Sequence, residues 1–272
     1  MSKKVHFTLF LFFISHFNYS QGWLPMGSRS QSLANASVCL ADVWSYHHNP
    51  AATANVESFG VGLSYENRFL LKELQSQGFV LVAPLKNGAL SGGAQSYGFN
   101  NYRTYRVGMG YSLNLTEVLT AGVQLNYHMI RLTQQYGNHQ TVTAELGLMA
   151  KVTDDWDFGF SVFNLGRNKL SEFMDDRYTT MLRFGTSYQV SRIVLLVAEL
   201  EKNIDYPLRS KFGVEYSPAK QFFVRGGFAT APIELSFGMG YRFADALLFD
   251  FGAAYHQQLG WCPNVSFSYL FK

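Results

Sequence analysis

The sequence predicts an all-β fold: a transmembrane antiparallel β-barrel of fourteen strands, with a short N-terminal plug in its lumen. Three observations predict it. Charged residues make up only 15% of the chain and aromatic residues 16%, whereas a water-soluble globular domain carries about 25% charge. From Ser58 onward apolar and polar residues alternate with a period of two, as in half-buried strands. The chain also begins with a segment typical of exported proteins.

Residues 1–20 are interpreted as an export signal peptide. Lys3 and Lys4 form a short basic region, and the apolar run Phe7–Ile14 after them is too short to span a bilayer. Loss of these two lysines lowers the formal net charge from +3 to +1, which gives no argument for a nucleic-acid partner. No other run approaches the ~18 apolar residues of a membrane helix. A membrane-bound mature chain therefore requires a closed barrel, in which backbone polar groups satisfy one another.

The stretch Ile233–Phe243 (IELSFGMGYRF) shows the alternation clearly. Its odd-numbered positions are apolar or aromatic, and its even-numbered positions are small or charged. The pattern recurs along the chain between turn-like breaks such as 217–220 and 244–245. An even number of strands of ~10 residues is the signature of an outer-membrane barrel. The predicted strands begin near Ser58, Gln75, Gly88, Tyr102, Val118, Gln140, Trp156, Thr179, Arg192, Pro207, Gln221, Ile233, Ala246 and Trp261.

A soluble β-sandwich is the alternative, because its strands alternate as well. Two features favour the membrane barrel. The apolar face carries Phe, Tyr or Leu on nearly every strand, and the last strand places Val265, Phe267, Tyr269 and Phe271 on one face. Aromatic residues also mark the strand ends, as interfacial girdles do: Tyr65, Tyr111, Trp156, Tyr188, Tyr216 and Trp261.

Residues 21–57 do not alternate and carry few large apolar side chains, which separates them from the barrel at residues 58–272. With both chain termini on the periplasmic side, this segment precedes the first strand and can fold back into the lumen as a plug. Its many small residues would let it pack closely against the wall. Pro50 fixes its own φ and pushes Asn49 into an extended conformation, so that Asn49 can cap a turn.

This segment carries a family resemblance. A small-residue stretch, then Ala-Asp, then an aromatic-flanked Asn-Pro-Ala before the first strand resembles the fatty-acid channel (FadL-like) superfamily of outer-membrane proteins. The short length and short predicted loops are most similar to the PorV/PorQ branch, which is associated with type IX secretion. The family's glycines before Ala-Asp are here residues 33–36, and its second Asp is Val43. The resemblance implies a plug (hatch) motif of Ala41, Asp42, Asn49, Pro50 and Ala51.

Two adjacent histidines, His47 and His48, precede the Asn-Pro turn and raise the question of a metal site. Neighbouring side chains point apart in an extended chain, and no Cys, Asp or Glu stands at a metal-ligand spacing from them. We therefore expect the pair to flank the turn within the plug, without binding metal.

The polar face of the strands is assigned to the lumen, where charges of both signs are interspersed. A fatty-acid conduit needs a continuous apolar lining, since a buried carboxylate beside an alkyl chain is costly. This lumen instead suits paired charges, ordered water and a hydrogen-bonded plug. The charged residues expected there are Arg106, Glu145, Arg183, Arg209, Glu215, Arg225, Glu234, Arg242 and Asp250.

The chain has two cysteines, Cys39 in the plug and Cys262 at the start of the last strand. The alternation predicts that Cys262 points inward, so a disulfide could tether the plug to the wall in an oxidising compartment. Because Cys262 lies near the external rim, two free thiols are the alternative.

The first functional hypothesis is a non-enzymatic outer-membrane barrel, an accessory or shuttle subunit of a protein export machine. Its partners would be outer-membrane lipid and a larger outer-membrane complex or exported cargo. The alternative is a passive transporter of hydrophobic small molecules, which the superfamily resemblance implies; a purely structural barrel is a third. No phosphate-binding loop or haem motif occurs, so no cofactor is expected. Asp175-Asp176 lack a histidine placed to complete a catalytic set, so no enzyme activity is expected.

Overall fold

The computed structural model describes residues 25–132, 138–167 and 178–271. The predicted signal peptide at residues 1–20 and the Asp175-Asp176 pair lie outside the described residues. Within the described ranges, no helix is long and apolar enough to cross a membrane.

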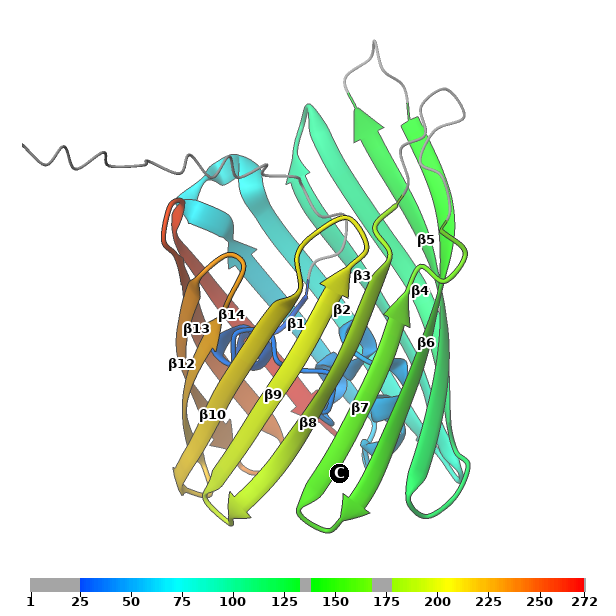
Figure 1. The fold of residues 1–272 in the computed structure, drawn as a ribbon, viewed down its shortest axis with the longest axis vertical. Coiled ribbons are helices and arrows are strands. Elements are labelled where there is room, and N and C mark those ends of the chain that lie inside the picture. The colour runs from blue at the N-terminus through cyan, green and yellow to red at the C-terminus, as the bar shows by residue number, and fades with distance from the viewer. Residues whose placement is uncertain (1–24, 133–137, 168–177, 272) are drawn as a thin grey trace, which may run out of the picture.

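Fourteen antiparallel strands form one closed barrel, in which each strand pairs with its neighbours in the sequence and the first pairs with the last (Figure 1). Each strand begins within two residues of the position that the alternation predicts, so the predicted barrel of fourteen strands is confirmed. The strands are β1 (Gly60–Asn67), β2 (Gln75–Leu85), β3 (Gly88–Phe99), β4 (Tyr102–Asn114), β5 (Leu119–Leu132), β6 (Asn138–Thr153), β7 (Trp156–Phe163), β8 (Met181–Ser191), β9 (Val194–Asn203), β10 (Arg209–Ala219), β11 (Phe222–Ala229), β12 (Glu234–Phe243), β13 (Leu247–His256) and β14 (Gly260–Leu270).

Side chains alternate across the wall of the barrel. On β12, Phe237 and Met239 face outward and are each 54% exposed, whereas Ser236 of the same strand faces inward and is fully buried. The same pattern leaves large apolar side chains exposed around the outer face on every strand. Such a surface is the one that the hydrocarbon of a bilayer covers, so it explains why this chain can expose what a soluble protein must bury.

The two ends of the barrel differ. At the end where β1 begins and β14 ends, called here the turn end, short turns join successive strands. At the opposite end, the loop end, most connections are longer. Two short 3₁₀ helices, η3 (Arg68–Leu70) and η4 (Lys72–Leu74), join β1 to β2, and residues 164–180 join β7 to β8.

Residues 25–57, called here the inner segment, lie inside the barrel and are drawn in blue in Figure 1. They form a short helix α1 (Ser28–Ser32) and two 3₁₀ helices, η1 (Val43–His47) and η2 (Pro50–Asn55). Helix α1 contacts β11 to β14, and η2 contacts β3 to β6. The inner segment therefore reaches from one side of the lumen to the other.

Inward-facing glycines surround the inner segment on twelve of the strands, all except β9 and β14. A Cβ atom built on any of them would come within 3.0 Å of an atom of the inner segment. Each missing side chain therefore makes room for the chain inside. These residues, called here the glycine belt, are Gly60, Gly62, Gly78, Gly93, Gly108, Gly122, Gly147, Gly159, Gly185, Gly213, Gly227, Gly238 and Gly252.

Candidate functional site

Helix η1 begins with a capping box at Asp42. Its carboxylate accepts a hydrogen bond from the backbone N–H of Trp44 (2.8 Å), and its own backbone N–H donates to Ser45 Oγ (3.0 Å). The second carboxylate oxygen pairs with Arg29 (3.0 Å). One side chain thus starts the helix and joins it to the beginning of the inner segment.

Asn49 caps η2 as the sequence predicts. Its backbone is extended (φ −154°, ψ 108°), and Pro50 occupies the start of the helix. Asn49 Oδ1 accepts from the N–H of Ala51 (3.1 Å), while Nδ2 donates to the carbonyls of Val38 (2.8 Å) and Leu148 on β6 (3.1 Å). Since both polar atoms of the amide are used, Asn49 joins the turn to the inner segment and to the wall.

A buried ion cluster lies on the β8–β10 side of the lumen. Glu199 pairs with Arg183 (2.8 Å) and with Lys211 (2.9 Å), and Lys211 also pairs with Glu201 (2.6 Å). All four side chains are buried. Buried charges need further hydrogen bonds to offset their lost hydration, so their remaining partners matter.

Those partners are backbone groups of the inner segment. Glu199 Oε2 accepts from the N–H groups of Ser37 (2.8 Å) and Val38 (2.9 Å), and Arg183 donates to the carbonyl of His48 (2.7 Å). The β8–β10 ion cluster (Arg183, Glu199, Glu201 and Lys211) therefore binds the main chain of the inner segment. Because the contacts are charge-assisted, they are among the stronger hydrogen bonds in the lumen.

A second cluster lies on the β10–β13 side and includes a charge from the inner segment. Arg225 lies between Glu215 (2.5 Å) and Asp250 (2.5 Å), and Arg29 pairs with the same Glu215 (2.8 Å). The wall network is therefore completed by a residue of the inner segment. We call these four residues the β10–β13 ion cluster.

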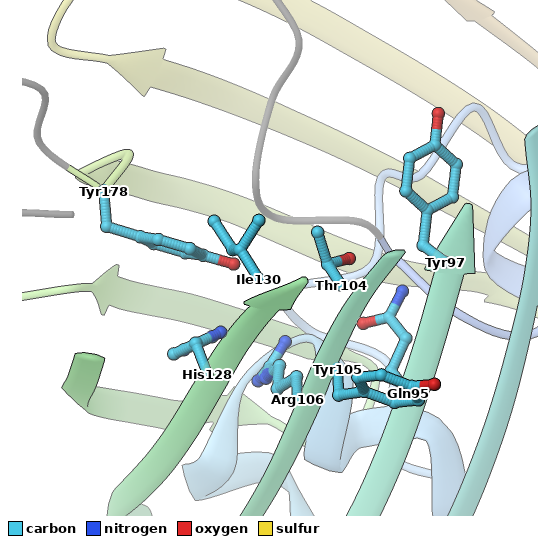
Figure 2. A pocket seen from close by; sticks show the side chains of 8 residues that line it. All are labelled: Gln95, Tyr97, Thr104, Tyr105, Arg106, His128, Ile130 and Tyr178. Atoms are coloured by element: carbon cyan, nitrogen blue, oxygen red, sulfur yellow. The ribbon is translucent and has the colours of Figure 1, made fainter. Parts of the chain in front are cut away.

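Figure 2 shows the side chains around a small space beside β3, β4 and β5, among them Gln95, Arg106 and His128, which face the lumen. Arg106 donates to Glu145 on β6 (2.6 Å) and lies over the ring of Phe163 (5.5 Å to the centroid). The ring of His128 packs 4.3 Å from that of Tyr178. The cavity that the side chains of Figure 2 enclose has a volume of about 10 Å³, which is room for one water molecule and no larger ligand.

Eight of the nine predicted lumenal charges form ion pairs: Arg106 with Glu145, Arg183 with Glu199, Arg209 with Glu234, and Arg225 with Glu215 and Asp250. The ninth, Arg242, stacks on the ring of Phe223 (5.0 Å to the centroid). Sequence reasoning missed Arg29, although it is the one Lys or Arg of residues 21–57. A single basic residue in a stretch with few charges is the sequence feature that could have identified Arg29 as a partner of the lumenal carboxylates.

A cavity of about 280 Å³ lies between the inner segment and the wall at the turn end. The turn between β12 and β13 borders it, as do charges of the β10–β13 ion cluster and Arg242. Its volume exceeds the ~150 Å³ of an engineered apolar cavity that binds benzene. The apolar side chains in its lining are Val43, Trp44, Val56, Phe223, Leu248 and Leu270.

Both histidines of the inner segment are buried. His48 donates through Nε2 to the carbonyl of Met26 (2.9 Å). Burial, with the nearby charge of Arg183, lowers the pKa of His48 to about 3, and burial likewise lowers the pKa of His47. Both rings are therefore neutral at pH 7. In the part of the chain that the structure describes, no group of three His, Cys, Asp or Glu could hold a metal ion.

The two cysteines are free and buried, so the disulfide that the sequence allows is not formed. Cys39 packs at Gly159 on β7, whereas Cys262 on β14 accepts a hydrogen bond from the N–H of Phe69 (3.4 Å). Strands β7 and β14 are seven positions apart in the barrel order. The thiols therefore lie on opposite sides of the lumen, beyond the reach of a disulfide.

No family model matches the sequence, and no curated protein matches it. Solved structures with a similar fold include the toluene transporter TbuX of Ralstonia pickettii, with a TM-score of 0.70, 14% identity, and coverage of 92% of this chain and 100% of that one. Another is the toluene transporter TodX of Pseudomonas putida, with a TM-score of 0.66, 14% identity, and coverage of 92% and 99%. A third is a FadL homologue of Pseudomonas aeruginosa, with a TM-score of 0.69, 12% identity, and coverage of 93% and 100%.

This chain has the barrel fold of these proteins. The similarity agrees with the FadL-like resemblance of the sequence at the level of the fold. The narrower resemblance to the PorV/PorQ branch stays a prediction.

Proposed function

We propose that the chain is a passive, non-enzymatic outer-membrane transporter of hydrophobic small molecules, with the inner segment as its plug and both termini periplasmic. This was the alternative hypothesis from the sequence, and we now prefer it. The cavity of about 280 Å³ at the turn end carries the proposal, because part of its wall is aromatic and aliphatic and can contact a small apolar molecule beside the plug. Five of the eight charged residues that also line it pair with one another. The fold shared with two toluene transporters supports the proposal.

Transport requires the inner segment to shift, because it fits closely against the glycine belt and is bound by the two ion clusters. Helix η2 lies against β3 to β6. There, Asn49 and the backbone of Ala51 contact Gly122 and Gly147 without any ion pair to the wall. A local displacement on this side breaks neutral contacts only, whereas a displacement on the β8–β10 side breaks the hydrogen bonds that Glu199 and Arg183 make with the backbone of the inner segment.

The test is the uptake of radiolabelled toluene by cells that express the chain in their outer membrane. We expect uptake several-fold faster than in cells with an empty vector. Leu248→Trp should reduce the gain, since Leu248 lines the cavity. The matched control Leu247→Trp places the same side chain on the outer face of β13 and should leave uptake unchanged. Equal uptake with and without the protein in the outer membrane would overturn the proposal.

The accessory-subunit hypothesis is the second candidate, and one observation favours it. Two buried ion clusters hold the inner segment in place, which suits a barrel whose lumen stays shut while its outer surface binds a partner. A gentle-detergent pull-down of the tagged protein, with mass spectrometry of proteins and lipids, separates the two candidates. A stoichiometric large membrane partner together with no gain in toluene uptake would favour the accessory role.

A further inference from the structure

The outward positions of the strands are almost free of charge, and the exceptions are grouped. Along the fourteen described strands no Asp or Glu faces outward, and the charged side chains that do are Arg103, Arg131 and Lys202. All three are basic. They lie near the loop end, where β4 begins and where β5 and β9 end.

Arg103 and Arg131 are direct cross-strand partners on β4 and β5. Like charges placed side by side on one face of a sheet repel each other. Neither guanidinium forms an ion pair with a carboxylate in the described part of the chain, and Arg103 Nε is buried without a hydrogen-bond partner there. The pair therefore lacks an anion.

The surroundings of the pair match the headgroup level of a membrane. Tyr105 and Tyr127 face outward on the same two strands, closer to the middle of the wall than the arginines. Tyrosine rings on an outer face favour the boundary between hydrocarbon and headgroups. The cross-strand partner of Arg103 on its other side is Gly98 of β3, which has no side chain to block an approaching headgroup.

We propose that Arg103 and Arg131 form a binding site for the phosphate of a membrane lipid, in the leaflet at the loop end. Two guanidinium groups present fork-shaped sets of donors that match phosphate oxygens. Basic groups just outside the hydrocarbon attract anionic lipid headgroups. Lys202 is separated from β5 by three strands and donates to the carbonyl of Tyr206, so it takes no part in the site.

Native mass spectrometry of the purified full-length mature protein tests the site, with phosphatidylglycerol and a diacylglycerol of the same acyl chains as probes. We expect the wild type to retain the phospholipid and release the diacylglycerol. Arg131→Gln should reduce retention of phosphatidylglycerol roughly fivefold, and the double variant Arg103→Gln/Arg131→Gln more than tenfold, since each basic group near the surface contributes independently. Lys202→Gln is the matched control and should retain as much lipid as the wild type.

The heat-dependent mobility of the folded barrel on gels shows whether each variant folds. If the double variant does not fold, Arg131→Gln, at an exposed position, tests the proposal by itself. Equal retention by Arg131→Gln and wild type would overturn the proposal. Equal retention of diacylglycerol and phosphatidylglycerol would also overturn it, because the phosphate would then be irrelevant. Displacement of the lipid by millimolar inorganic phosphate would show a site for the free ion and would overturn the assignment to a lipid.

Discussion

The glycine belt fits against both sides of the inner segment, but the polar contacts that join each side to the wall differ. On the β8–β13 side, two buried ion clusters bind its backbone and Arg29. On the β3–β6 side, η2 fits against glycines and is joined to the wall by neutral hydrogen bonds from Asn49 and Thr53. One side therefore has charged contacts in addition to the close fit, whereas the other side has the close fit and neutral hydrogen bonds alone.

This difference predicts where the segment moves first. Moving the segment away from the β8–β13 side separates the Arg29–Glu215 ion pair and breaks charge-assisted hydrogen bonds to its backbone, and loss of a partner from a buried ion pair costs several kcal/mol. Losing one neutral hydrogen bond costs about 1 kcal/mol. The β3–β6 side is therefore the one expected to open, with the β8–β13 side as the fixed point.

The largest effect is expected from Glu199→Ala. This change leaves Arg183 and Lys211 buried without the carboxylate that they share, and loss of one partner of a buried pair costs about 3–5 kcal/mol. The melting temperature of the barrel should fall. Amide hydrogen exchange should accelerate at residues 35–40, while residues 49–55 keep their protection.

Asp154→Ala is the control for this variant, because it removes an ion pair with Lys151 in which Asp154 is 99% exposed. It should change neither melting nor exchange. If Glu199→Ala accelerates exchange equally on both sides, the two sides are not held independently and the comparison fails.

A smaller effect is expected from Gly147→Ala in the glycine belt. The added Cβ would lie 2.1 Å from Asn49 Oδ1 and 2.9 Å from the backbone nitrogen of Ala51. Overpacking of this kind costs about 1–3 kcal/mol. The displaced η2 should raise the conductance of single proteins in a planar bilayer.

Gly92→Ala is the matched control, since the nearest heavy atom to its new Cβ lies at 3.7 Å. Conductance and melting temperature should match the wild type. A Gly147→Ala protein with wild-type conductance would show that the fit at this glycine does not keep the lumen closed.

Asn49→Ala should have a weaker effect still. It removes the cap of η2 and the hydrogen bonds to Val38 and Leu148, and loss of a helix cap costs about 0.5–2 kcal/mol. We expect altered permeability with an intact barrel. Asn114→Ala, at an exposed turn-end position, should leave permeability unchanged, and an Asn49→Ala protein with unchanged conductance would argue against a gating role.

The smallest effect at neutral pH is expected at His48, whose contribution changes only in acid. Its folded-state pKa is lowered to about 3, below the ~6.5 of the unfolded chain. The unfolded state therefore binds more protons between these values, so stability is full above pH 6.5 and declines as the pH falls toward 3. His48→Gln should flatten this decline in thermal melts relative to the wild type. An equal slope in both proteins would place the acid sensitivity elsewhere.

The barrel could be predicted from the sequence because lipid and lumen impose opposite chemistry on alternate residues, and each strand repeats the signal. The Asn49-Pro50 turn was predictable too, since both residues act on their own backbone. The ion pairs were not. Which lumenal charge meets which depends on the stagger between strands, and the partners of Arg29 depend on how the inner segment lies in the lumen. Neither leaves a periodic signal.

The glycine belt also determines the width of the pore that the barrel would form without its inner segment. A chain without residues 25–57 would have bare main chain at the level where thirteen side chains are missing, so its lumen would be widest where it is now shut. Sugars and hydrophilic antibiotics would then leak into the cell. The glycines give the wall a shape complementary to the inner segment. The barrel without this segment would therefore be open to polar solutes.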